Sequence, residues 1–357
     1  MISGLLKVLV IILMFGIIVF VHEFGHFLFA KLNKIKVNEF AIGMGPAIAK
    51  WKKKETQYSL RCLPIGGYCL MEGEADDSKD ENAFNTKSIP ARLSVCFAGP
   101  FFNFILAFLL SIIICHYYAI DPPVLSEVLP NSAAAEAGLQ EGDTIVKLNG
   151  NRVMTFREIS VFRMVTDPKK PIKVTYERDG QTYETTVNLK FDEESQSYMF
   201  GITSMGREAK NFGEELKYSL IEVRYQVKTT FMSLKMLFTG KASANDLMGP
   251  VGIGHVMSDV IDEAAEQSTP ETRALNVFLN IINFMVLISA NLGVMNLLPI
   301  PALDGGRILF IIAEAVVGKP IPRDKEAIVN GIGFVLLMLL MVFVFFNDMS
   351  NLFVGAK

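Results

Sequence analysis

Charged residues, cysteines and histidines are all scarce in this sequence. Charged side chains make up 20% of the 357 residues and hydrophobic side chains 51%, and the mean hydropathy is +0.35. A mainly disordered chain would need the opposite balance, with low hydrophobicity and high charge. An ordinary soluble protein is also less apolar than this chain. The composition therefore excludes both classes.

The few cysteines and the small net charge exclude further classes. The four cysteines form no Cys-x-x-Cys pair, which argues against a disulfide framework or a structural zinc ribbon. The formal net charge is −3, so nothing in the composition points to a nucleic-acid partner. Only four histidines are present, and their positions are therefore informative.

Four segments are long and apolar enough to cross a bilayer. They comprise approximately residues 5–32, 93–118, 275–298 and 328–346. Each spans about 20 residues or more, which is the length that the hydrocarbon core requires. The first segment is too long for the apolar region of a signal peptide, and no small-residue cleavage site ends it. We expect four transmembrane helices.

The distribution of lysine and arginine predicts the orientation of these helices. Eleven such residues lie from Lys31 to Arg92 and four lie between the last two spans, whereas each terminal region carries one. Short cytoplasmic loops are enriched in positive charge. We therefore expect both connecting loops in the cytoplasm. Both termini and the long connection from about residue 119 to residue 273 are expected on the outer side.

That long connection contains signals for a folded domain and a helix. Short β-type runs alternate with turns over residues 124–204, and residues 212–238 repeat apolar side chains at the spacing of an amphipathic helix. Such a helix can lie on the membrane surface or pack on the neighbouring domain, and the sequence leaves both open. We expect a first transmembrane half, an inserted domain, a helix with a linker and a second transmembrane half, at residues 1–118, 119–206, 207–271 and 272–357.

The first cytoplasmic loop contains a β-type segment at residues 60–70, around Gly66 and Gly67. This pattern predicts a β-hairpin that dips into the membrane. Open backbone at that depth is tolerated only against protein or a water-filled cavity.

The strongest functional signal is His22-Glu23-Phe24-Gly25-His26, inside the first apolar segment. Positions i and i+4 share one face of a helix, so His22 and His26 can bind one metal ion, with Glu23 beside them as a general base for water. Two histidines that merely face other helices are the alternative. However, an unpaired carboxylate in an apolar helix costs about 2.5 kcal/mol or more on insertion scales. That cost favours a functional role.

Asp304 is the best candidate for a third ligand, because hydrolytic zinc sites usually have three protein ligands. It follows Pro299 and Pro301, which end the third apolar helix, and it precedes Gly305 and Gly306, which let the backbone approach closely. A simple turn residue is the alternative reading of Asp304. Together with the two histidines, it predicts one Zn²⁺ per chain.

Five motifs spread over most of the chain carry a family resemblance. They are HEFGH at residues 22–26, LPIGGY at 63–68, AGPFFN at 98–103, MGPVGI at 248–253 and NLLPIPALDG at 296–305. With these motifs the sequence resembles the site-2 protease family of intramembrane zinc metalloproteases. It is most similar to the bacterial branch of the regulator-of-sigma-E-protease type, which cleaves membrane-bound anti-sigma factors.

The resemblance implies roles for individual residues. His22, His26 and Asp304 would be the zinc ligands, and Glu23 would be the catalytic base. Gly99 and Asn103, in the third of these motifs, are expected to serve helix packing rather than catalysis.

A second group of residues is implied to bind the substrate. Asn296 and Asn291 would hydrogen-bond the substrate backbone or its oxyanion, although helix capping or interhelical hydrogen bonding remains an alternative for both. The edge of the hairpin at Gly66 and Gly67 is a candidate template for an unwound, strand-like substrate.

The inserted domain resembles a PDZ domain of the type found in bacterial proteases. The resemblance lies in the segment VLPNSAAAEAGLQEGDTIVKLNG at residues 128–150. It implies an α+β fold that binds a peptide or a substrate tail by strand addition beside a helix. The sequence contains one such segment, whereas some members of the family carry two.

Taken together, we expect a multi-pass α-helical protein of the bacterial inner (cytoplasmic) membrane, with an extracytoplasmic PDZ domain and a membrane-associated β-hairpin. It would be an intramembrane zinc metalloprotease that cleaves transmembrane segments of single-span proteins in regulated intramembrane proteolysis. Anti-sigma factors or remnant signal peptides are the expected substrates. A membrane-anchored PDZ scaffold is one rival, but a scaffold needs no carboxylate in the bilayer. A zinc transporter is another, but it should offer polar groups along a crossing path.

Overall fold

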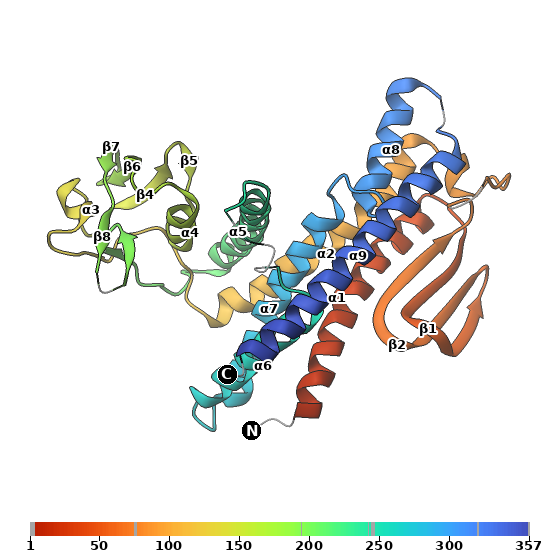
Figure 1. Cartoon of the computed structure of the whole chain (residues 1–357), viewed down its shortest axis with the longest axis horizontal. Helices are drawn as coiled ribbons and strands as arrows, with labels where there is room; N and C mark the ends of the chain where they lie inside the picture. The colour runs from red at the N-terminus through yellow and green to blue at the C-terminus, as the bar shows by residue number, and fades with distance from the viewer. Residues whose placement is uncertain are drawn as a thin grey trace. The chain divides into compact units, whose positions relative to one another are not determined.

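The computed structural model describes residues 4–74, 77–193, 195–241, 243, 247–319 and 321–355. The chain forms two compact units, and Figure 1 labels many of their elements. The first unit joins Met1–Leu110 to Ser243–Lys357, and the second comprises Ser111–Ala242.

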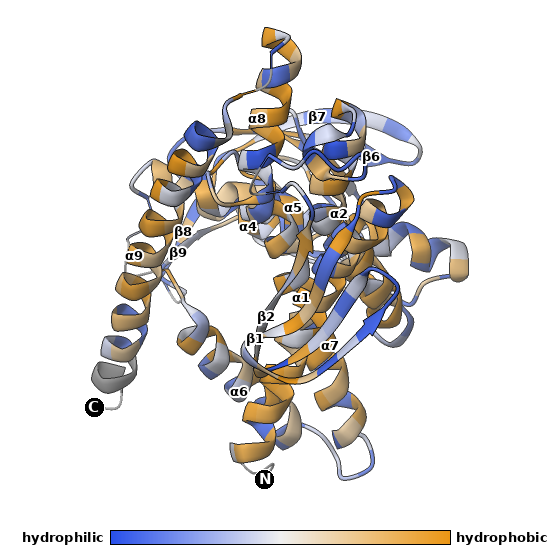
Figure 2. Cartoon of the chain, turned by 90° about the vertical axis from the view of Figure 1, so that its right-hand side faces the viewer, coloured by the Kyte–Doolittle hydropathy of each residue, from blue (hydrophilic) through white to orange (hydrophobic). Residues whose placement is uncertain are grey.

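The four segments predicted to cross the membrane are long helices. They are α1 (Gly4–Leu32), α2 (Ile89–Tyr117), α7 (Arg273–Asn296) and α9 (Arg323–Gly355). Within the described ranges, these four are the helices long and apolar enough to cross a membrane, and Figure 2 shows how hydrophobic residues dominate α1, α7 and α9. The predicted multi-pass helical fold is confirmed.

Two further α-helices belong to the first unit. α6 (Pro250–Glu266) packs on α1, α7 and α9, and α8 (Asp304–Val317) follows the turn that ends α7. The buried carboxylate of Asp348 on α9 accepts hydrogen bonds from Gly249 N–H at 3.0 Å and from Gly252 N–H at 2.8 Å. A helix leaves its first backbone N–H groups without partners inside the helix. Asp348 therefore caps α6 and fixes it to α9.

The loop between α1 and α2 forms a hairpin that is longer than predicted. It consists of β1 (Val37–Lys53) and β2 (Thr56–Met71). The hairpin itself is as expected, but its predicted centre was wrong. The strands turn between Lys53 and Thr56, whereas Gly66 and Gly67 lie near the end of β2.

Both strands of this hairpin bend, so that one segment of β1 has partners on both sides. Residues 39–42 pair with residues 67–70 on one side and with residues 57–60 on the other. Gly43, Gly45 and Gly66 have φ values of 85°, 83° and 82°, a conformation that glycine adopts at little cost. In this chain glycine therefore marks a bend within a strand rather than the hairpin turn.

Residues 67–71 form one edge of this small sheet, and no other described strand pairs with their outer side. β2 packs against α1. The shared core comprises buried residues from α1, the hairpin, the short helix η1 (Phe84–Thr86), α2 and α8: Ala30, Ile35, Val37, Phe40, Cys69, Met71, Phe84, Val95, Cys96 and Ile311. This packing holds the strand edge beside the HEFGH segment.

The second unit contains a small α+β domain, as predicted. Its main sheet has the order β5 (Asn151–Arg152), β4 (Thr144–Leu148), β6 (Ile172–Arg178) and β7 (Gln181–Val187). Two smaller pairs join β3 (Glu127–Val128) to β10 (Ile202–Thr203) and β8 (Lys190–Asp192) to β9 (Ser197–Met199). The helices α3 (Ala133–Glu136) and α4 (Arg157–Val165) cover a common apolar core.

The amphipathic helix α5 (Phe212–Phe238) packs on this domain, which was one of the two alternatives left open by the sequence. Arg224 and Lys228 on α5 bind the buried carboxylate of Glu158 on α4. Glu222 on α5 binds Arg157 at 2.5 Å. The side of α5 that faces the domain is thus held largely by ion pairs. Apolar side chains on α5 remain exposed, including Leu220, Phe231 and Phe238.

Candidate metal centre

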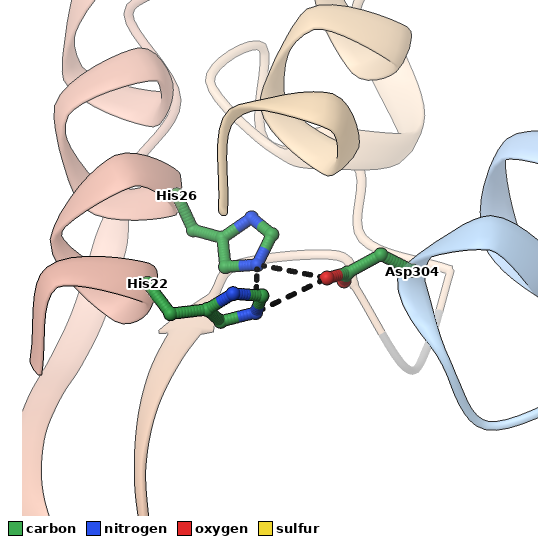
Figure 3. Close-up of side chains that lie close together, drawn as sticks. All are labelled: His22, His26 and Asp304. Atoms are coloured by element: carbon green, nitrogen blue, oxygen red, sulfur yellow. Dashed lines mark hydrogen bonds and ion pairs between the residues drawn. The ribbon is translucent and has the colours of Figure 1, made fainter. Parts of the chain in front are cut away.

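Three side chains from two distant segments converge on one point (Figure 3). His22 and His26 lie one turn apart on α1, and Asp304 is the first residue of α8. The Nε2 atoms of the histidines are 3.2 Å apart, and Asp304 Oδ2 lies 3.2 Å from His22 Nε2 and 3.3 Å from His26 Nε2. Both histidines are buried, with 7% and 8% of their surface exposed. The structure therefore brings together the three predicted ligands.

This triangle of donor atoms has the dimensions that zinc requires. Zinc–nitrogen and zinc–oxygen bonds of about 2.0–2.2 Å in a tetrahedron place neighbouring donors about 3.3 Å apart. Two imidazole nitrogens and one carboxylate oxygen are also a usual donor set for catalytic zinc, with a fourth position left for water. The residues present thus fit a bound Zn²⁺ ion.

The hydrogen bond on the far side of the His26 ring supports the same assignment. His26 Nδ1 lies 2.8 Å from the carbonyl oxygen of Val95 on α2. That oxygen can only accept a hydrogen bond, so Nδ1 carries the proton. In the neutral ring, Nε2 then has a free lone pair, which faces the space between the three donor atoms. Val95 therefore selects the tautomer of His26 that is able to bind a metal ion.

Gly99 on α2 provides the space for His26. A Cβ atom added at Gly99 would lie only 2.2 Å from His26 Nε2, the donor atom itself. α1 and α2 also touch at Gly25, where a Cβ atom would lie 2.5 Å from the carbonyl oxygen of Ala98. The two glycines thus allow a close helix crossing, and that crossing places the α2 backbone against the His26 ring.

Asn103 performs the corresponding function for His22. It is fully buried, and its amide lies 3.2 Å from His22 Nδ1. In the structure the amide nitrogen of Asn103 faces the His22 ring, and its buried Oδ1 has no hydrogen-bond partner. A half-turn of the amide group exchanges these atoms. Oδ1 then accepts the Nδ1 proton, and the lone pair of His22 Nε2 becomes free for a metal ion.

A tightly folded turn presents Asp304. α7 ends at Asn296, as the prolines predicted. Cβ atoms added at Gly305 and Gly306 would lie 2.2 Å and 2.4 Å from the carbonyl oxygens of Leu298 and Ile300. The turn therefore passes directly beneath the start of α8, and only glycine fits at these two positions.

Glu23 and two of the predicted substrate-binding residues lie close to this triangle. A Cβ atom added at Gly67 would lie 3.3 Å from Glu23 Cγ, so the carboxylate side chain rests against the backbone at the strand edge. Asn296 Nδ2 lies 3.5 Å from His22 Nε2. Asn291 lies five residues earlier on α7, and Gly66 adjoins Gly67 on β2.

The other two histidines contact other carboxylates. His116 contacts Glu215 at 3.2 Å, and His255 contacts Asp259 at 3.0 Å. Among the described residues, His22, His26 and Asp304 are the one group of three His, Cys, Asp or Glu side chains arranged to hold a metal ion.

Gly99 and Asn103, which were expected to serve helix packing, also contact the imidazole rings of His26 and His22. Their spacing of four residues on α2 places them on one face of that helix, which was a signal that the sequence contained. No comparable signal identified Val95, since it acts through its backbone carbonyl group.

Comparison with solved structures finds likeness in the inserted domain. The PDZ domain of an SdrC-like protein from Listeria monocytogenes covers 24% of this chain and 90% of its own, with 21% identity and a TM-score of 0.21. A solution structure from Geobacillus thermodenitrificans covers 23% of this chain and 95% of its own, with 26% identity and a TM-score of 0.21.

Comparison with whole sequences covers almost the entire chain. A protein of Clostridium acetobutylicum named as a zinc metalloprotease is 42% identical over 342 residues, or 96% of this chain and 97% of its own. The regulator of sigma-W protease RasP of Bacillus subtilis is 31% identical over 430 aligned residues, covering 97% of this chain and 99% of its own. The zinc metalloprotease RasP of Geobacillus kaustophilus is 32% identical and covers 99% of this chain and all of its own length. The model of peptidase family M50 matches residues 10–340. The chain therefore belongs to peptidase family M50, the site-2 protease family, and is a membrane-spanning zinc metalloprotease.

Proposed function

We propose that this protease cleaves the membrane-spanning segments of single-span membrane proteins, with His22, His26 and Asp304 as zinc ligands and Glu23 as catalytic base. The observation that carries the proposal is the donor triangle on α1 and α8, which fits zinc and lies on a helix apolar enough to cross a membrane. A protease for soluble substrates would have no need to bury its metal ligands in such a helix.

The roles of the individual residues follow from their positions. Zinc, when bound, acts as a Lewis acid and lowers the pKa of a water ligand. Glu23 accepts a proton from the attacking water and later donates it to the leaving amine. The Asn296 amide, 3.5 Å from His22 Nε2, donates a hydrogen bond to the substrate carbonyl oxygen as negative charge develops on it. Asn291 assists from the same helix.

The strand edge at Gly66 and Gly67 binds the substrate backbone. A transmembrane helix uses its own carbonyl groups in internal hydrogen bonds, so it must unwind before a peptide bond can be attacked. Residues 67–71 offer an edge without a described strand partner, and Gly67 touches Glu23. An unwound segment that adds to this edge as a strand has its backbone satisfied beside the catalytic base.

Anti-sigma factors and remnant signal peptides are the substrates we propose, in regulated intramembrane proteolysis. The relative from Bacillus subtilis is named a regulator of sigma-W, which supports a role of this chain in releasing a sigma factor. The distribution of Lys and Arg supports a location in the bacterial cytoplasmic membrane, with both termini and the inserted domain outside.

The inserted domain is proposed to be a PDZ domain that binds a peptide or the tail of a substrate. A groove of about 520 Å³ lies between α4 and the segment around β10, and its lining includes Ile159, Arg163, Gly201 and Ile202. A peptide could add beside this segment while its side chains face α4.

Fragment analysis with a Glu23→Gln variant tests the catalytic proposal. Each form is co-expressed with a library of single-span proteins. The wild type should release cytoplasmic fragments that Glu23→Gln does not, whereas Glu141→Gln, which changes an exposed carboxylate in the inserted domain, should match the wild type. A PDZ scaffold or a zinc transporter would yield no fragments that depend on Glu23.

Metal analysis tests the ligand assignment. Purified wild type should contain about one equivalent of zinc, as a single three-ligand site predicts. The His22→Ala, His26→Ala double variant should contain almost none, because only Asp304 would remain of the donor set. Stoichiometric zinc in the folded double variant would refute the assignment.

A further inference from the structure

One carboxylate, that of Glu74, connects the proposed substrate edge to the helix that presents Asp304. Glu74 Oε2 accepts a hydrogen bond from Met71 N–H at 3.1 Å, at the last residue of β2. Glu74 Oε1 accepts a hydrogen bond from Arg307 Nη1 on α8. The Glu74 side chain is 12% exposed and that of Arg307 is 35% exposed, so this ion pair is partly shielded from water.

Arg307 lies on the same face of α8 as the metal ligand. Asp304, Arg307, Ile311 and Glu314 are spaced by three, four and three residues, which aligns them along one side of a helix. Ile311 is buried in the core that includes β2 and α2. Glu314 forms two hydrogen bonds with Arg92 of α2, at 2.7 Å and 2.9 Å. Two ion pairs therefore flank Ile311, Arg307–Glu74 and Glu314–Arg92. The first is connected to the hairpin through the hydrogen bond between Glu74 and Met71.

The turn that carries Glu74 is itself well fixed. Glu72 N–H donates to the carbonyl oxygen of Lys36 at 2.9 Å, and Phe84 N–H donates to that of Glu72 at 2.7 Å. Gly73 has a φ of 66°, and a Cβ atom there would lie 2.1 Å from Asn85 Oδ1. Glu74 is thus attached to a turn with little conformational freedom, so its two hydrogen bonds hold the β2 edge and α8 at a fixed distance from each other.

We propose that Glu74 is a positioning residue that sets the register between a substrate strand on the β2 edge and the metal ligand Asp304. The inference rests on the proposed function, because it requires substrate to pair with residues 67–71. A carboxylate has two acceptor atoms, and Glu74 uses one for Met71 and the other for Arg307. Without this bridge, the edge and α8 can shift relative to each other, and the substrate can pair in more than one register.

The Glu74→Gln variant is the sharpest test, because glutamine has one acceptor oxygen in place of two and no negative charge, so it cannot offer separate oxygen atoms to Met71 N–H and Arg307. Glu314→Gln is the matched control. It makes the same chemical change in the ion pair that joins α8 to Arg92 of α2. Arg307→Ala breaks the same bridge from the opposite side, and it serves as the second variant if Glu74→Gln does not fold.

Two measurements are made on the purified full-length variants. Zinc affinity is measured by competition with a chelator. The ends of the fragments are identified by mass spectrometry, with a library reporter that the wild type cleaves and Glu23→Gln does not. Glu74→Gln and Arg307→Ala should weaken zinc binding by up to about tenfold, the lower end for groups that support metal ligands. They should also add a cleavage site two residues from the original one. A shift of the substrate strand by one residue would turn every side chain to the opposite face, so two residues is the smallest shift that keeps each side chain on its face.

The Glu314→Gln control distinguishes a change in substrate register from an effect of a less firmly held α8. Glu314→Gln should weaken zinc binding but keep the single wild-type cleavage site. Wild-type fragment ends in both Glu74→Gln and Arg307→Ala would overturn the proposal. If the wild type cleaves no reporter, the proposed function is wrong. In that case zinc affinity still tests the role of Glu74, and unchanged zinc affinity in both Glu74→Gln and Arg307→Ala would overturn it.

Discussion

Two residues of α2 orient the imidazole rings that α1 presents. The carbonyl oxygen of Val95 binds His26 Nδ1, and the amide of Asn103 binds His22 Nδ1. Groups that hold metal ligands in this way fix the tautomer and the ring direction, and their loss typically reduces metal affinity by about 10- to 100-fold. The candidate metal site thus depends on α2, although its three converging side chains come from α1 and α8.

Gly99→Ala should severely weaken zinc binding. The added methyl group would lie 2.2 Å from His26 Nε2, and the ring cannot move away without losing its bond to Val95. We expect at least a tenfold lower zinc affinity by chelator competition, the smallest effect typical of lost support for a ligand. Gly331→Ala on α9 is the control, since a Cβ atom there meets nothing within 4 Å. Equal affinities in the two variants would show that Gly99 does not shape the site.

At the scale of elements, the start of α5 depends on an ion pair that responds to pH. Glu214 in the first turn of α5 accepts hydrogen bonds from Arg207 at 2.6 Å and 3.0 Å and from Lys210 N–H at 2.7 Å. Hydrogen bonding to the Arg207 guanidinium, reinforced by the Lys210 N–H, lowers the pKa of Glu214 to about 2. In an unfolded chain the pKa of glutamate is about 4.3.

The first turn of α5 should therefore loosen as the pH falls from about 4.3 toward 2. A carboxylate with a lowered pKa in the folded state stabilises the fold above its unfolded pKa, and this contribution is lost when the group becomes protonated. The protection of the amides in the first turn of α5 against hydrogen exchange, relative to their intrinsic exchange rates at each pH, should fall over this range in the wild type. Glu214→Gln should exchange faster at neutral pH and lose that part of the pH dependence. A wild-type profile in the variant would contradict the prediction.

At the scale of the whole molecule, the orientation in the membrane determines where products are released. In the proposed topology α1 enters from the outer side, and at 1.5 Å per residue His22 lies roughly 25 Å along the helix from Leu5. The metal centre would then lie near the cytoplasmic leaflet.

Cysteine labelling in intact cells tests this orientation. Cysteines introduced at residues 50–54, near the turn of the hairpin, should react with a membrane-impermeant reagent only after the cells are opened. A cysteine that replaces exposed Glu141 of the inserted domain should react in intact cells, provided that the reagent reaches the outer face of the membrane. Labelling of residues 50–54 from outside would refute the proposed topology.

The inserted domain is expected to admit trimmed substrates and to exclude bulky ones. It contains no histidine between Pro122 and Ser204, so it contributes no imidazole ligand for zinc. The ends of the domain lie close together, because Ile120 and Arg207 exchange backbone hydrogen bonds of 2.8 Å and 3.0 Å. A short linker can therefore replace residues 122–204.

This deletion should preserve cleavage of a pre-shortened substrate and allow cleavage of an untrimmed one. Removing a folded module removes its steric barrier while α1 and α8 keep their ligands. The measurement compares fragments from both substrates in the wild type and the deletion variant, with zinc content as the control for folding. A stable, zinc-loaded deletion variant that still rejects the untrimmed substrate would place the gate elsewhere, with α5 as the next candidate.

Local features of the sequence were sufficient to predict the helices and the three side chains that converge at the candidate metal site. The spacing of His22 and His26 on one helical face, and the prolines before Asp304, depend on short-range geometry that holds in almost any fold. Membrane spans are likewise recognisable because the bilayer imposes a length and an apolar composition on each segment. These predictions required no knowledge of which elements meet.

The contacts that support the site depend on the tertiary structure alone. The hairpin turn was misplaced because glycine permits both turns and strand bends, and only the pairing of residues 39–42 on both sides distinguishes them. The contact of Gly99 with His26 and the pairing of Glu74 with Arg307 join positions 73 and 233 residues apart. No local pattern encodes such partners, because they arise when packing of the apolar core brings α1, α2, α8 and the hairpin together.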